Sequence, residues 1–413
     1  MPLGRRDTEG PARRARRWAL APALAVVILT ALGATVELTG VLDGFRPADA
    51  ASDGPAQQRP TMAERLAQMR RSLHAPRPSR QPAPLRVVRV TPKDGVSDAP
   101  GRRAVVVRFS VPVESGAHPR LSPSTPGHWA RGAKTTLTFR PTVPFVPDTT
   151  VTMRLPVGDA GVRGVLGGEL RKPVTVRWRT ADGSTLRLQQ LLADLGYLPV
   201  AFHSADDVPD TRAAQTEAAY DPPAGSFSWK SDHAPAVLRS LWAPGKYNVM
   251  TRGAVMAFQH ANGLTMDGVA GHDVWAALIH DAVVHDTADQ PYSWAWASKG
   301  QPERLRIWRD GSFVFSTLAN TGVPEAPTPS GTWPVYARLR TDTMSGTNPD
   351  GTHYRDPGIP YVNYFNGGDA VHGFERSGYG YPQSVGCVEV PVSAAKRIWG
   401  LIDYGTLVTV TDG

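Results

Sequence analysis

The chain has 413 residues with a single cysteine, and its 40 Gly and 38 Pro favour short strands and turns over long helices. The length predicts several domains, and the lone cysteine excludes an intrachain disulfide. The net charge of +8 arises within residues 1–90, which hold 15 Arg against 7 Asp or Glu; the balanced remainder gives no sign of a nucleic-acid partner.

The first 50 residues have the pattern of an export signal. Six arginines in residues 1–17 precede an apolar run, 18–36, that is long enough to span a bilayer. Positive charge stays on the cytoplasmic side, so we expect a basic cytoplasmic segment at 1–17 and everything after the run outside. Residues 18–42 are a signal anchor or a signal peptide. Small residues at 48–50 offer a cleavage site, so membrane anchoring and secretion to the wall both remain open.

Residues 43–84 are rich in Pro, Ala, Arg, Ser and Gln and are expected to form a linker, with one short helix near Met62–Leu73. Residues 85–182 then alternate apolar and polar positions in short runs, as in Val105, Val107 and Phe109. Period two with Pro and Gly between the runs predicts half-buried strands. We expect a small immunoglobulin-like sandwich that acts as a spacer.

Residues 183–285 change to helical spacing. Four leucines between 188 and 195 follow an i, i+3, i+4, i+7 pattern, and Ser184 is a candidate cap for their helix. A second helix capped by Thr251 and a third near 274–279 complete a small three-helix bundle. A stretch near 200–245 is rich in Pro, Asp and Ser and is expected to be an insertion.

The amino-acid sequence of this segment resembles that of the peptidoglycan-binding domain found in many wall hydrolases. LGYLP (195–199), AVMAFQ (254–259), NGL (262–264) and DGVAG (267–271) follow in the order and spacing of that module. The resemblance implies that residues 183–285 bind peptidoglycan glycan. The sequence departs from the module by the insertion near 200–245.

Residues 290–413 return to a β pattern. An Asp310-Gly311 turn between two alternating apolar runs predicts a hairpin. A helix is expected after Pro391, and a closing strand at 406–410. These elements predict a separate C-terminal β domain.

The cysteine lies in a motif suited to nucleophilic chemistry. Cys387 follows Gly386, which lets the backbone approach a substrate closely and leaves N–H groups to bind a developing oxyanion. His372 lies upstream, and the turn-rich stretch 374–383 is able to fold back and bring the imidazole to the thiol. A cysteine needs such a neighbour, because a free thiol is only a few per cent thiolate at neutral pH. The alternative is a buried, inert thiol.

These residues resemble the L,D-transpeptidase catalytic domain. TPSGTW (328–333), NYFNGG (363–368), His372-Gly373, Ser384-x-Gly386-Cys387 and GTLVTV (405–410) occur in the order of that family. The resemblance implies a mixed β-sandwich at 290–413 and hence a multidomain, mainly β chain. It also implies an exported enzyme of the bacterial cell envelope.

The resemblance further implies an acyl-enzyme mechanism on peptidoglycan stem peptides. Cys387 would attack the carbonyl between the diamino acid at position three and D-Ala at position four, and the amine of another stem would accept the acyl group. His372 would serve as base and then acid. Backbone N–H groups of Gly386 and Cys387 would hold the oxyanion, Ser384 would support the loop, and the carbonyl of Gly373 would orient His372.

Four further residues are candidates for substrate contact: Tyr361, Asn363, His353 and Glu389. Family members often carry Arg or Asn at the position of Glu389, and a carboxylate there is expected to raise the thiol pKa if it lies close. The competing interpretations are core packing for Tyr361 and Asn363 and a surface loop for His353.

The resemblance implies no metal or organic cofactor. It does imply that carbapenem β-lactams acylate Cys387. Three functions stay open: the transpeptidase, an L,D-carboxypeptidase with water as acceptor, and a non-catalytic peptidoglycan-binding scaffold. Val385, where many members have His, leaves room for the scaffold. A papain-like peptidase is excluded, because its cysteine precedes its histidine and no histidine follows Cys387.

Overall fold

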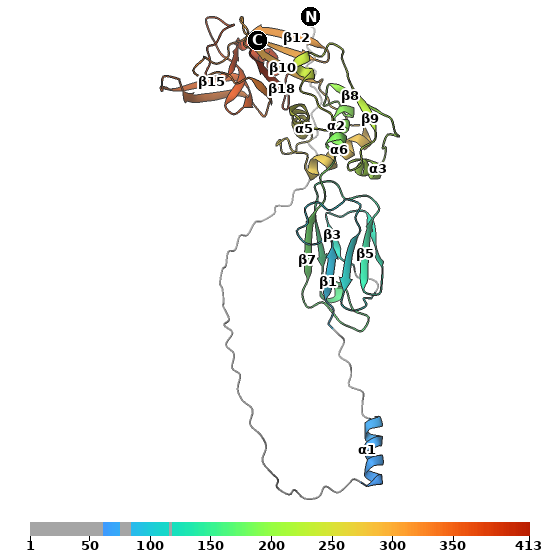
Figure 1. Cartoon of the computed structure of the whole chain (residues 1–413). Helices are drawn as coiled ribbons and strands as arrows, with labels where there is room; N and C mark the ends of the chain where they lie inside the picture. The colour runs from blue at the N-terminus through green and yellow to red at the C-terminus, as the bar shows by residue number, and fades with distance from the viewer. Residues whose placement is uncertain (1–60, 75–83, 115–117) are drawn as a thin grey trace, which may run out of the picture. The chain divides into compact units, whose positions relative to one another are not determined.

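The computed structural model describes residues 61–74, 84–114 and 118–413 (Figure 1). The chain divides into two units between Pro78 and Ser79. The first contains α1 (Met62–His74), the helix expected in the linker. The expected cytoplasmic segment and signal anchor or peptide at 1–42 lie outside the described residues. In the ranges that are described, no helix is both long enough and apolar enough to cross a membrane.

Residues 84–114 and 118–180 form the expected immunoglobulin-like sandwich of two sheets, ordered β1-β2-β5-β4 and β3-β6-β7 (Figure 1). Val105, Val107 and Phe109 all point into the core between the sheets, as their alternation predicts. Val151 and Met153 meet them from the other sheet. The strands are β1 (Val87–Thr91), β2 (Val105–Phe109), β3 (Arg120–Ser122), β4 (Gly127–Arg131), β5 (Thr136–Pro141), β6 (Thr150–Leu155) and β7 (Val174–Arg179).

The helical module that follows has three main helices around one core. The apolar sides of α2, α5 and α6 meet there, with Leu191, Phe258 and Trp275 among the buried residues. The stretch near 200–245 adds a two-stranded antiparallel sheet, β8–β9, and two short helices, the first of which lies between the two strands in sequence. The elements are α2 (Thr185–Asp194), β8 (Val200–Ser204), α3 (Arg212–Ala218), β9 (Gly225–Trp229), α4 (Ala236–Arg239), α5 (Val249–Ala261) and α6 (His272–Val284).

One of the two expected helix caps is correct and the other is wrong. Ser184 caps α2, and its side chain accepts the Arg187 N–H at 3.4 Å. Thr251 does not cap α5. The cap is Asn248, whose side chain accepts the Thr251 N–H at 2.8 Å, so the helix begins three residues earlier. The Thr251 hydroxyl is buried and accepts a hydrogen bond from Gln189 at 2.8 Å instead.

The C-terminal domain is the expected mixed β-sandwich. Its sheets have the orders β12-β11-β10-β18-β13 and β14-β15-β16-β17. The pairs β10–β18 and β16–β17 are parallel, and the other pairs are antiparallel. The strands are β10 (Ser293–Ser298), β11 (Arg304–Arg309), β12 (Ser312–Leu318), β13 (Gly331–Pro334), β14 (Ala337–Thr347), β15 (His353–Asn366), β16 (Asp369–Gly373), β17 (Val388–Val390) and β18 (Leu407–Thr411); the helix is α7 (Val392–Trp399).

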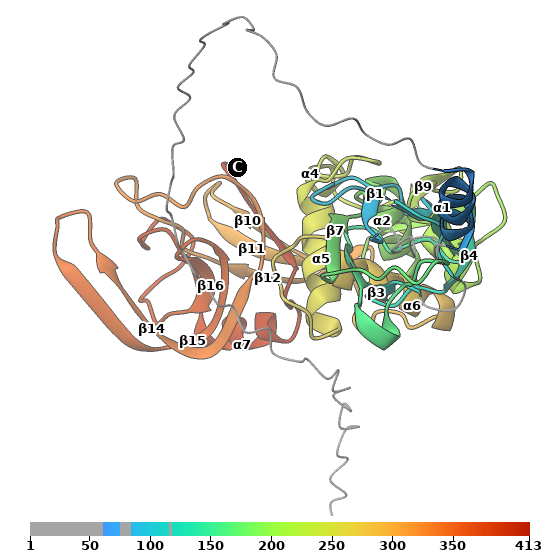
Figure 2. The same ribbon diagram turned by 90° about the horizontal axis from the view of Figure 1, so that it is seen from below.

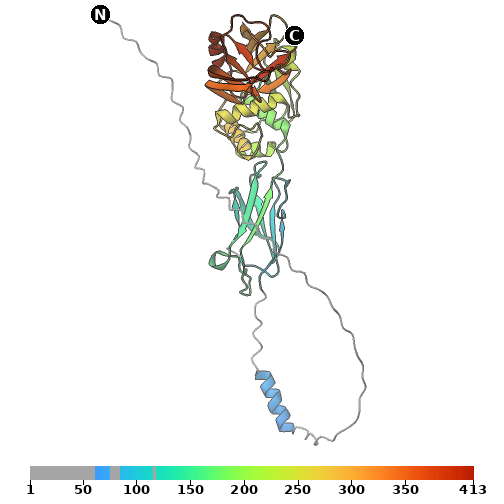
Figure 3. The ribbon, with the colours of Figure 1, turned by 90° about the vertical axis from the view of Figure 1, so that its left-hand side faces the viewer.

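Two features of this domain go beyond the expected elements. β14 and β15 are much longer than their neighbours and form an extended hairpin (Figure 2). The domain also shares a core with the helical module, because Trp294, Trp308 and Leu407 pack in the same cluster as α2, α5 and α6. The yellow α5 helix lies next to the strands of the C-terminal domain in Figure 3.

Glycines allow this close approach. A Cβ on Gly253 of α5 would lie 2.6 Å from the carbonyl oxygen of Gly405, just before β18. Gly405 has φ +78° and would itself collide with the backbone of α5 if it carried a side chain. The helix backbone therefore rests directly on the backbone at the start of the closing strand.

Candidate active site

The register of β16 with β17 places the cysteine and the histidine on one face of their sheet. His372 lies opposite Glu389 and Val371 opposite Val388, so Cys387, one residue before β17, falls beside Ala370. Side chains alternate along a strand, and residues opposite each other share a face. Cys387, Ala370 and His372 therefore project from the same face, with the thiol and the imidazole diagonal neighbours.

The opposite face of that sheet is buried between the two sheets of the domain. Val371, Val388 and Val390 belong to the main core with Ile307 and Val408. The face that carries Cys387 forms a smaller apolar cluster of its own: Ile359, Val362, Ala370, Met344, Tyr364, Phe374 and Cys387. Period two thus divides this sheet into a structural face and a face on which the reactive side chains are gathered.

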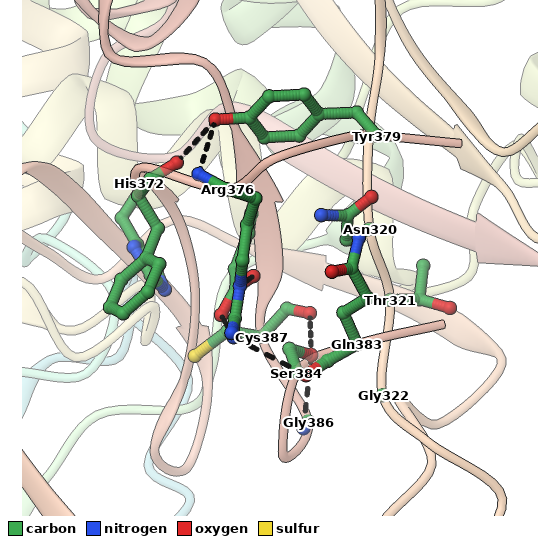
Figure 4. Close-up of polar contacts among 12 residues, drawn as sticks. Asn320, Thr321, Gly322, His372, Arg376, Tyr379, Gln383, Ser384, Gly386 and Cys387 are labelled. Atoms are coloured by element: carbon green, nitrogen blue, oxygen red, sulfur yellow. Dashed lines mark hydrogen bonds and ion pairs between the residues drawn. The ribbon is translucent and has the colours of Figure 1, made fainter. Parts of the chain in front are cut away.

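The turn before Cys387 is held from inside by Ser384. This hydroxyl, 2% exposed, donates to the Cys387 carbonyl at 2.6 Å and accepts the Gly386 N–H at 3.3 Å (Figure 4). Thr328 Oγ1 donates to the same carbonyl at 3.3 Å. Ser384 and Thr328 therefore fix the backbone on which the thiol is mounted.

Gly386 fills a position that no other residue fits. Its φ is +120°, and a Cβ would lie 2.5 Å from the carboxylate oxygen Oδ1 of Asp369. Its N–H, which was expected to bind an oxyanion, is already donated to Ser384 in the resting loop. Asp369 is held by Asn366 Nδ2 at 3.0 Å, and desolvation raises the pKa of its carboxyl.

A neighbouring segment outside the motif braces this turn. Gln383 and Ser384 both donate their N–H groups to the carbonyl of Thr321, at 2.9 and 3.0 Å. The Thr321 N–H and hydroxyl in turn donate to the two carboxylate oxygens of Glu303, at 2.6 and 2.8 Å. Asn320 exchanges two backbone hydrogen bonds of 2.9 Å with Glu389. The loop that carries Cys387 is thus tied to the segment 320–321 that follows β12.

His372 is a buried imidazole in a defined tautomer. Its Nδ1 lies 3.0 Å from the carbonyl oxygen of Gly373. A carbonyl only accepts, so Nδ1 carries the hydrogen and the neutral ring presents Nε2 as an acceptor. Burial lowers the pKa of His372 below 6.5, opposed by this hydrogen bond and by Glu389. The ring is therefore neutral at physiological pH and able to take a proton.

Cys387 is partly exposed, and its resting form is the thiol. Desolvation is the main cause that raises the pKa of Cys387 to about 12; a hydrogen bond from the Ala370 backbone opposes the rise, and Asp369 and Glu389 contribute to it. The sulfur lies 3.9 Å from the Gly368 carbonyl, to which the S–H is donated. Cys387 and His372 thus rest as a neutral thiol and a neutral imidazole, and the thiol needs the base in order to react.

Glu389 raises the thiol pKa, as expected from sequence, but it is not placed to bind substrate. It is 4% exposed, and both of its carboxylate oxygens accept hydrogen bonds from Arg376, at 2.9 Å each. Sequence reasoning missed Arg376, which lies in the turn-rich stretch between His372 and the cysteine. Its guanidinium also stacks 4.5 Å from the Phe374 ring centroid. The carboxylate is therefore neutralised by a partner from the loop.

Two other candidates for substrate contact lie on the core side of the sheet. Asn363 is fully buried and is opposite Val371, which points into the main core. Its side chain accepts from Arg338 at 3.0 Å and donates to the Tyr361 carbonyl at 2.9 Å. Tyr361 packs against the same core, beside the ring of Trp399. Neither residue is placed to contact a substrate at the thiol.

The long hairpin brings in residues that were not predicted. His353 is exposed at its far end, 3.1 Å from the Thr347 hydroxyl. Burial raises the pKa of the adjacent Tyr354, and negative charge on Cys387, Asp356 and Glu389 adds to the rise. Tyr364 donates to Asp342 at 2.7 Å and packs in the same apolar cluster as Cys387. Tyr364, rather than His353, is the hairpin residue that packs near the thiol. Among the described residues, no group of three His, Cys, Asp or Glu is arranged to hold a metal ion.

Comparison with known protein families identifies the family that the C-terminal domain matches. Residues 292–410 match the model of the L,D-transpeptidase catalytic domain. The C-terminal domain belongs to that family. Residues 240–278, which precede that domain, match the model of a putative peptidoglycan binding domain. The first match contains His372 and Cys387, and the second contains α5 but ends within α6.

Solved L,D-transpeptidases are also similar to this chain. One from Mycobacterium smegmatis is 13% identical over 80% of this chain and 100% of its own, with a TM-score of 0.27. The catalytic domain from E. faecium acylated by ertapenem is 27% identical over 30% of this chain and 100% of its own, also at 0.27. No curated protein gives a significant match. At these TM-scores the assignment rests on the family model rather than on the structural similarity.

Proposed function

We propose that the protein is a cell-wall L,D-transpeptidase that cross-links peptidoglycan stem peptides through a thioester on Cys387. The observation that carries the proposal is the common sheet face of Cys387 and His372, inside a segment that matches the catalytic family. The neutral imidazole has its acceptor nitrogen free because the Gly373 carbonyl occupies the other. This is the state that a general base requires.

In the first half-reaction, His372 Nε2 takes the thiol proton as the sulfur attacks the carbonyl carbon between the diamino acid at position three and D-Ala at position four. The Cys387 N–H holds the oxyanion, joined by the Gly386 N–H when it turns away from Ser384. The C–N bond then breaks, and His372 returns the proton to the departing amine of D-Ala. The acyl group stays on the sulfur as a thioester.

In the second half-reaction, an amine of another stem attacks the thioester and expels the thiolate, which recovers a proton through His372. The alternative acceptor is water, which would make the protein an L,D-carboxypeptidase. The charges around the thiol favour the amine. The Asp369 carboxylate lies against Gly386, next to the nucleophile, where it attracts an ammonium group during approach.

The same nucleophile is proposed to open the β-lactam ring of carbapenems and to keep the opened ring as a thioester. The related E. faecium domain is known in a form acylated by ertapenem. The helical module is proposed to hold the glycan or stem peptides of the wall, in line with its family match. Both roles place the protein in the extracytoplasmic envelope, with the N-terminal apolar run as membrane anchor or signal peptide.

Mass spectrometry of the products formed by the full-length protein from tetrapeptide-stem muropeptides tests the proposal. Cys387→Ala and His372→Ala are compared with the wild type, and His280→Ala, an exposed histidine on α6, is the matched control. We expect a dimer lacking one D-Ala from the wild type and the control, and none from the other two.

Each of the other results has a distinct meaning. A tripeptide formed only with Cys387 present identifies a carboxypeptidase. No product, together with no carbapenem adduct on the intact protein, identifies a non-catalytic scaffold and overturns the proposal. An adduct without a product shows that the nucleophile works and that the required acceptor was missing.

A further inference from the structure

A buried arginine in the helical module forms no close ion pair with a described residue; the Asp194 carboxylate acts on its charge only from beyond ion-pair distance. Arg187 on α2 is 2% exposed, and among the residues that the structure describes, no carboxylate lies within ion-pair distance of it. Its Nε has no hydrogen-bond partner. A buried charge is normally paired, since desolvating an unpaired ion is costly. The missing partner of this guanidinium calls for an explanation.

Two glutamines hold the guanidinium in a fixed orientation. Nη1 donates to Gln190 Oε1 at 3.0 Å, and Nη2 donates to Gln215 Oε1 at 2.6 Å. The amide nitrogens of these glutamines donate to the carbonyls of Pro223 and Pro209, at 2.9 and 2.6 Å, which fixes the amide orientation. Both acceptors are neutral, so they orient the fork without supplying a negative charge at hydrogen-bond distance.

The arginine lines a cavity of about 150 Å³. Its walls are largely apolar, and one rim residue, Val208, is 69% exposed. The lining residues are Arg187, Asp194, Phe202, Ser204, Val208, Pro209 and Pro223. Since a water molecule occupies about 30 Å³ in the liquid, the cavity has room for a small organic group. It combines one buried cation with apolar walls.

We propose that this cavity binds the terminal carboxylate of a small apolar amino-acid residue. The planar fork of arginine matches a carboxylate, and the apolar walls match a short side chain better than they match a fully hydrated inorganic anion. The C-terminus of a wall stem peptide and a free amino acid both present this group. Asp194 at the rim would meet the ammonium of a free amino acid, which an acylated peptide end lacks.

Nothing in the family match assigns this site. The matched segment of the peptidoglycan binding domain begins at residue 240, whereas the cavity is built by α2, β8 and the loops around 206–223. Its charged residues lie on α2, and its other walls come from the stretch near 200–245 by which this module departs from the family pattern. The site is also independent of the chemistry at Cys387, and binding is expected to persist in Cys387→Ala.

Calorimetric titration of the full-length Cys387→Ala protein tests the proposal. The probes are N-acetyl-D-alanine, D-alanine, the neutral N-acetyl-D-alaninamide and inorganic phosphate. The NMR signal of the Arg187 Nε–H, assigned by its loss in Arg187→Lys, reports on this cavity and not on the catalytic site. We expect N-acetyl-D-alanine to bind and to shift this signal, and the amide and phosphate to do neither. Tighter binding of D-alanine would identify a free amino acid as the source of the carboxylate.

Variants at the rim test the site without disturbing the core. Val208→Glu places a negative charge beside the ligand and is expected to weaken binding about tenfold, while the isosteric Val208→Thr stays within about twofold of the parent. A variant of the buried arginine itself complements the rim variants. Arg187→Lys keeps the charge but loses the fork and is expected to weaken binding by a similar factor.

Equal binding of the amide, an unchanged affinity in Val208→Glu, or no shift of the Arg187 signal with any probe would overturn the proposal.

Discussion

Arg376 donates two hydrogen bonds of 2.9 Å to the two carboxylate oxygens of Glu389, directly opposite His372 in the sheet. Glu389 raises the pKa of both His372 and Cys387, whereas Arg376 lowers that of His372. The pair thus adds a carboxylate to the reactive face and compensates it from the loop. It ties the conformation of 374–383 to the electrostatics of the site.

Removing the arginine should destabilise the domain. Arg376→Gln leaves a nearly buried carboxylate without its partner, and we expect the free energy of unfolding to fall by about 2–3 kcal/mol, toward the lower range for broken buried pairs because Arg376 is partly exposed. Denaturant unfolding measures this loss. The double variant Arg376→Gln, Glu389→Gln should recover most of it, and a double variant as unstable as the single one would contradict a paired role.

The acid limb of the pH–rate profile should report on His372. The base must be neutral, and burial lowers its pKa below 6.5. Acylation by a carbapenem should therefore stay constant from neutral pH down to about pH 6.5 and fall only below it. Arg376→Gln removes a group that lowers this pKa, so its acid limb should move to higher pH. An acid limb at the same pH in the wild type and in Arg376→Gln would argue against His372 as the base.

The thiol should make the protein less stable in alkali. The folded pKa of about 12 is above the unfolded value of 9.0, so above pH 9 the unfolded state holds fewer protons and unfolding becomes easier as pH rises toward 12. The slope is at most about 1.4 kcal/mol per pH unit. Cys387→Ala and Cys387→Ser should lack this contribution in denaturant unfolding between pH 9 and 10.5. Equal slopes in all three proteins would show that the folded thiol is not desolvated.

The conformation of Gly386 should be essential to acylation. Gly386→Ala introduces a Cβ that collides with Asp369 and a residue that disfavours φ +120°. A displaced thiol should reduce the rate of carbapenem acylation about 100-fold, measured by intact mass over time. Adding Asp369→Ala relieves the collision but not the backbone strain, so it should restore only part of the rate. Full activity of Gly386→Ala would mean that the loop is not held as described.

The strands and helices with clear periodicity were predictable from sequence, whereas contacts across the fold were not. The alternation at 105–109 and the leucines at 188–195 specify a buried face by themselves. Asn363 illustrates the limit. Whether it faces the thiol or the core depends on its register opposite Val371, which is a property of strand pairing rather than of the local pattern.

Other features were missed because their signals are weak or remote. The β8–β9 pair lies in a Pro- and Asp-rich stretch, where frequent turn residues interrupt the alternating pattern that would indicate short strands. The Thr251 cap was wrong because Asn248, three residues earlier, competes for the same role. In the site, Cys387, His372 and Ser384 could be found through their motif. Arg376 could not, because only folding of the loop brings it to Glu389.

The backbone contact between Gly253 and Gly405 has a mechanical consequence. The backbones meet at Gly253 and Gly405, the Leu407 side chain of β18 also packs against α5, and the aromatic cluster around Trp294 and Trp308 continues across the same junction. Such a contact leaves little room for relative movement, so a force applied to the helical module is transmitted directly to the closing strand. If that module holds the wall while the thiol reacts, the fold itself, and not a flexible linker, sets the distance between the bound wall and the cross-link that is formed at Cys387.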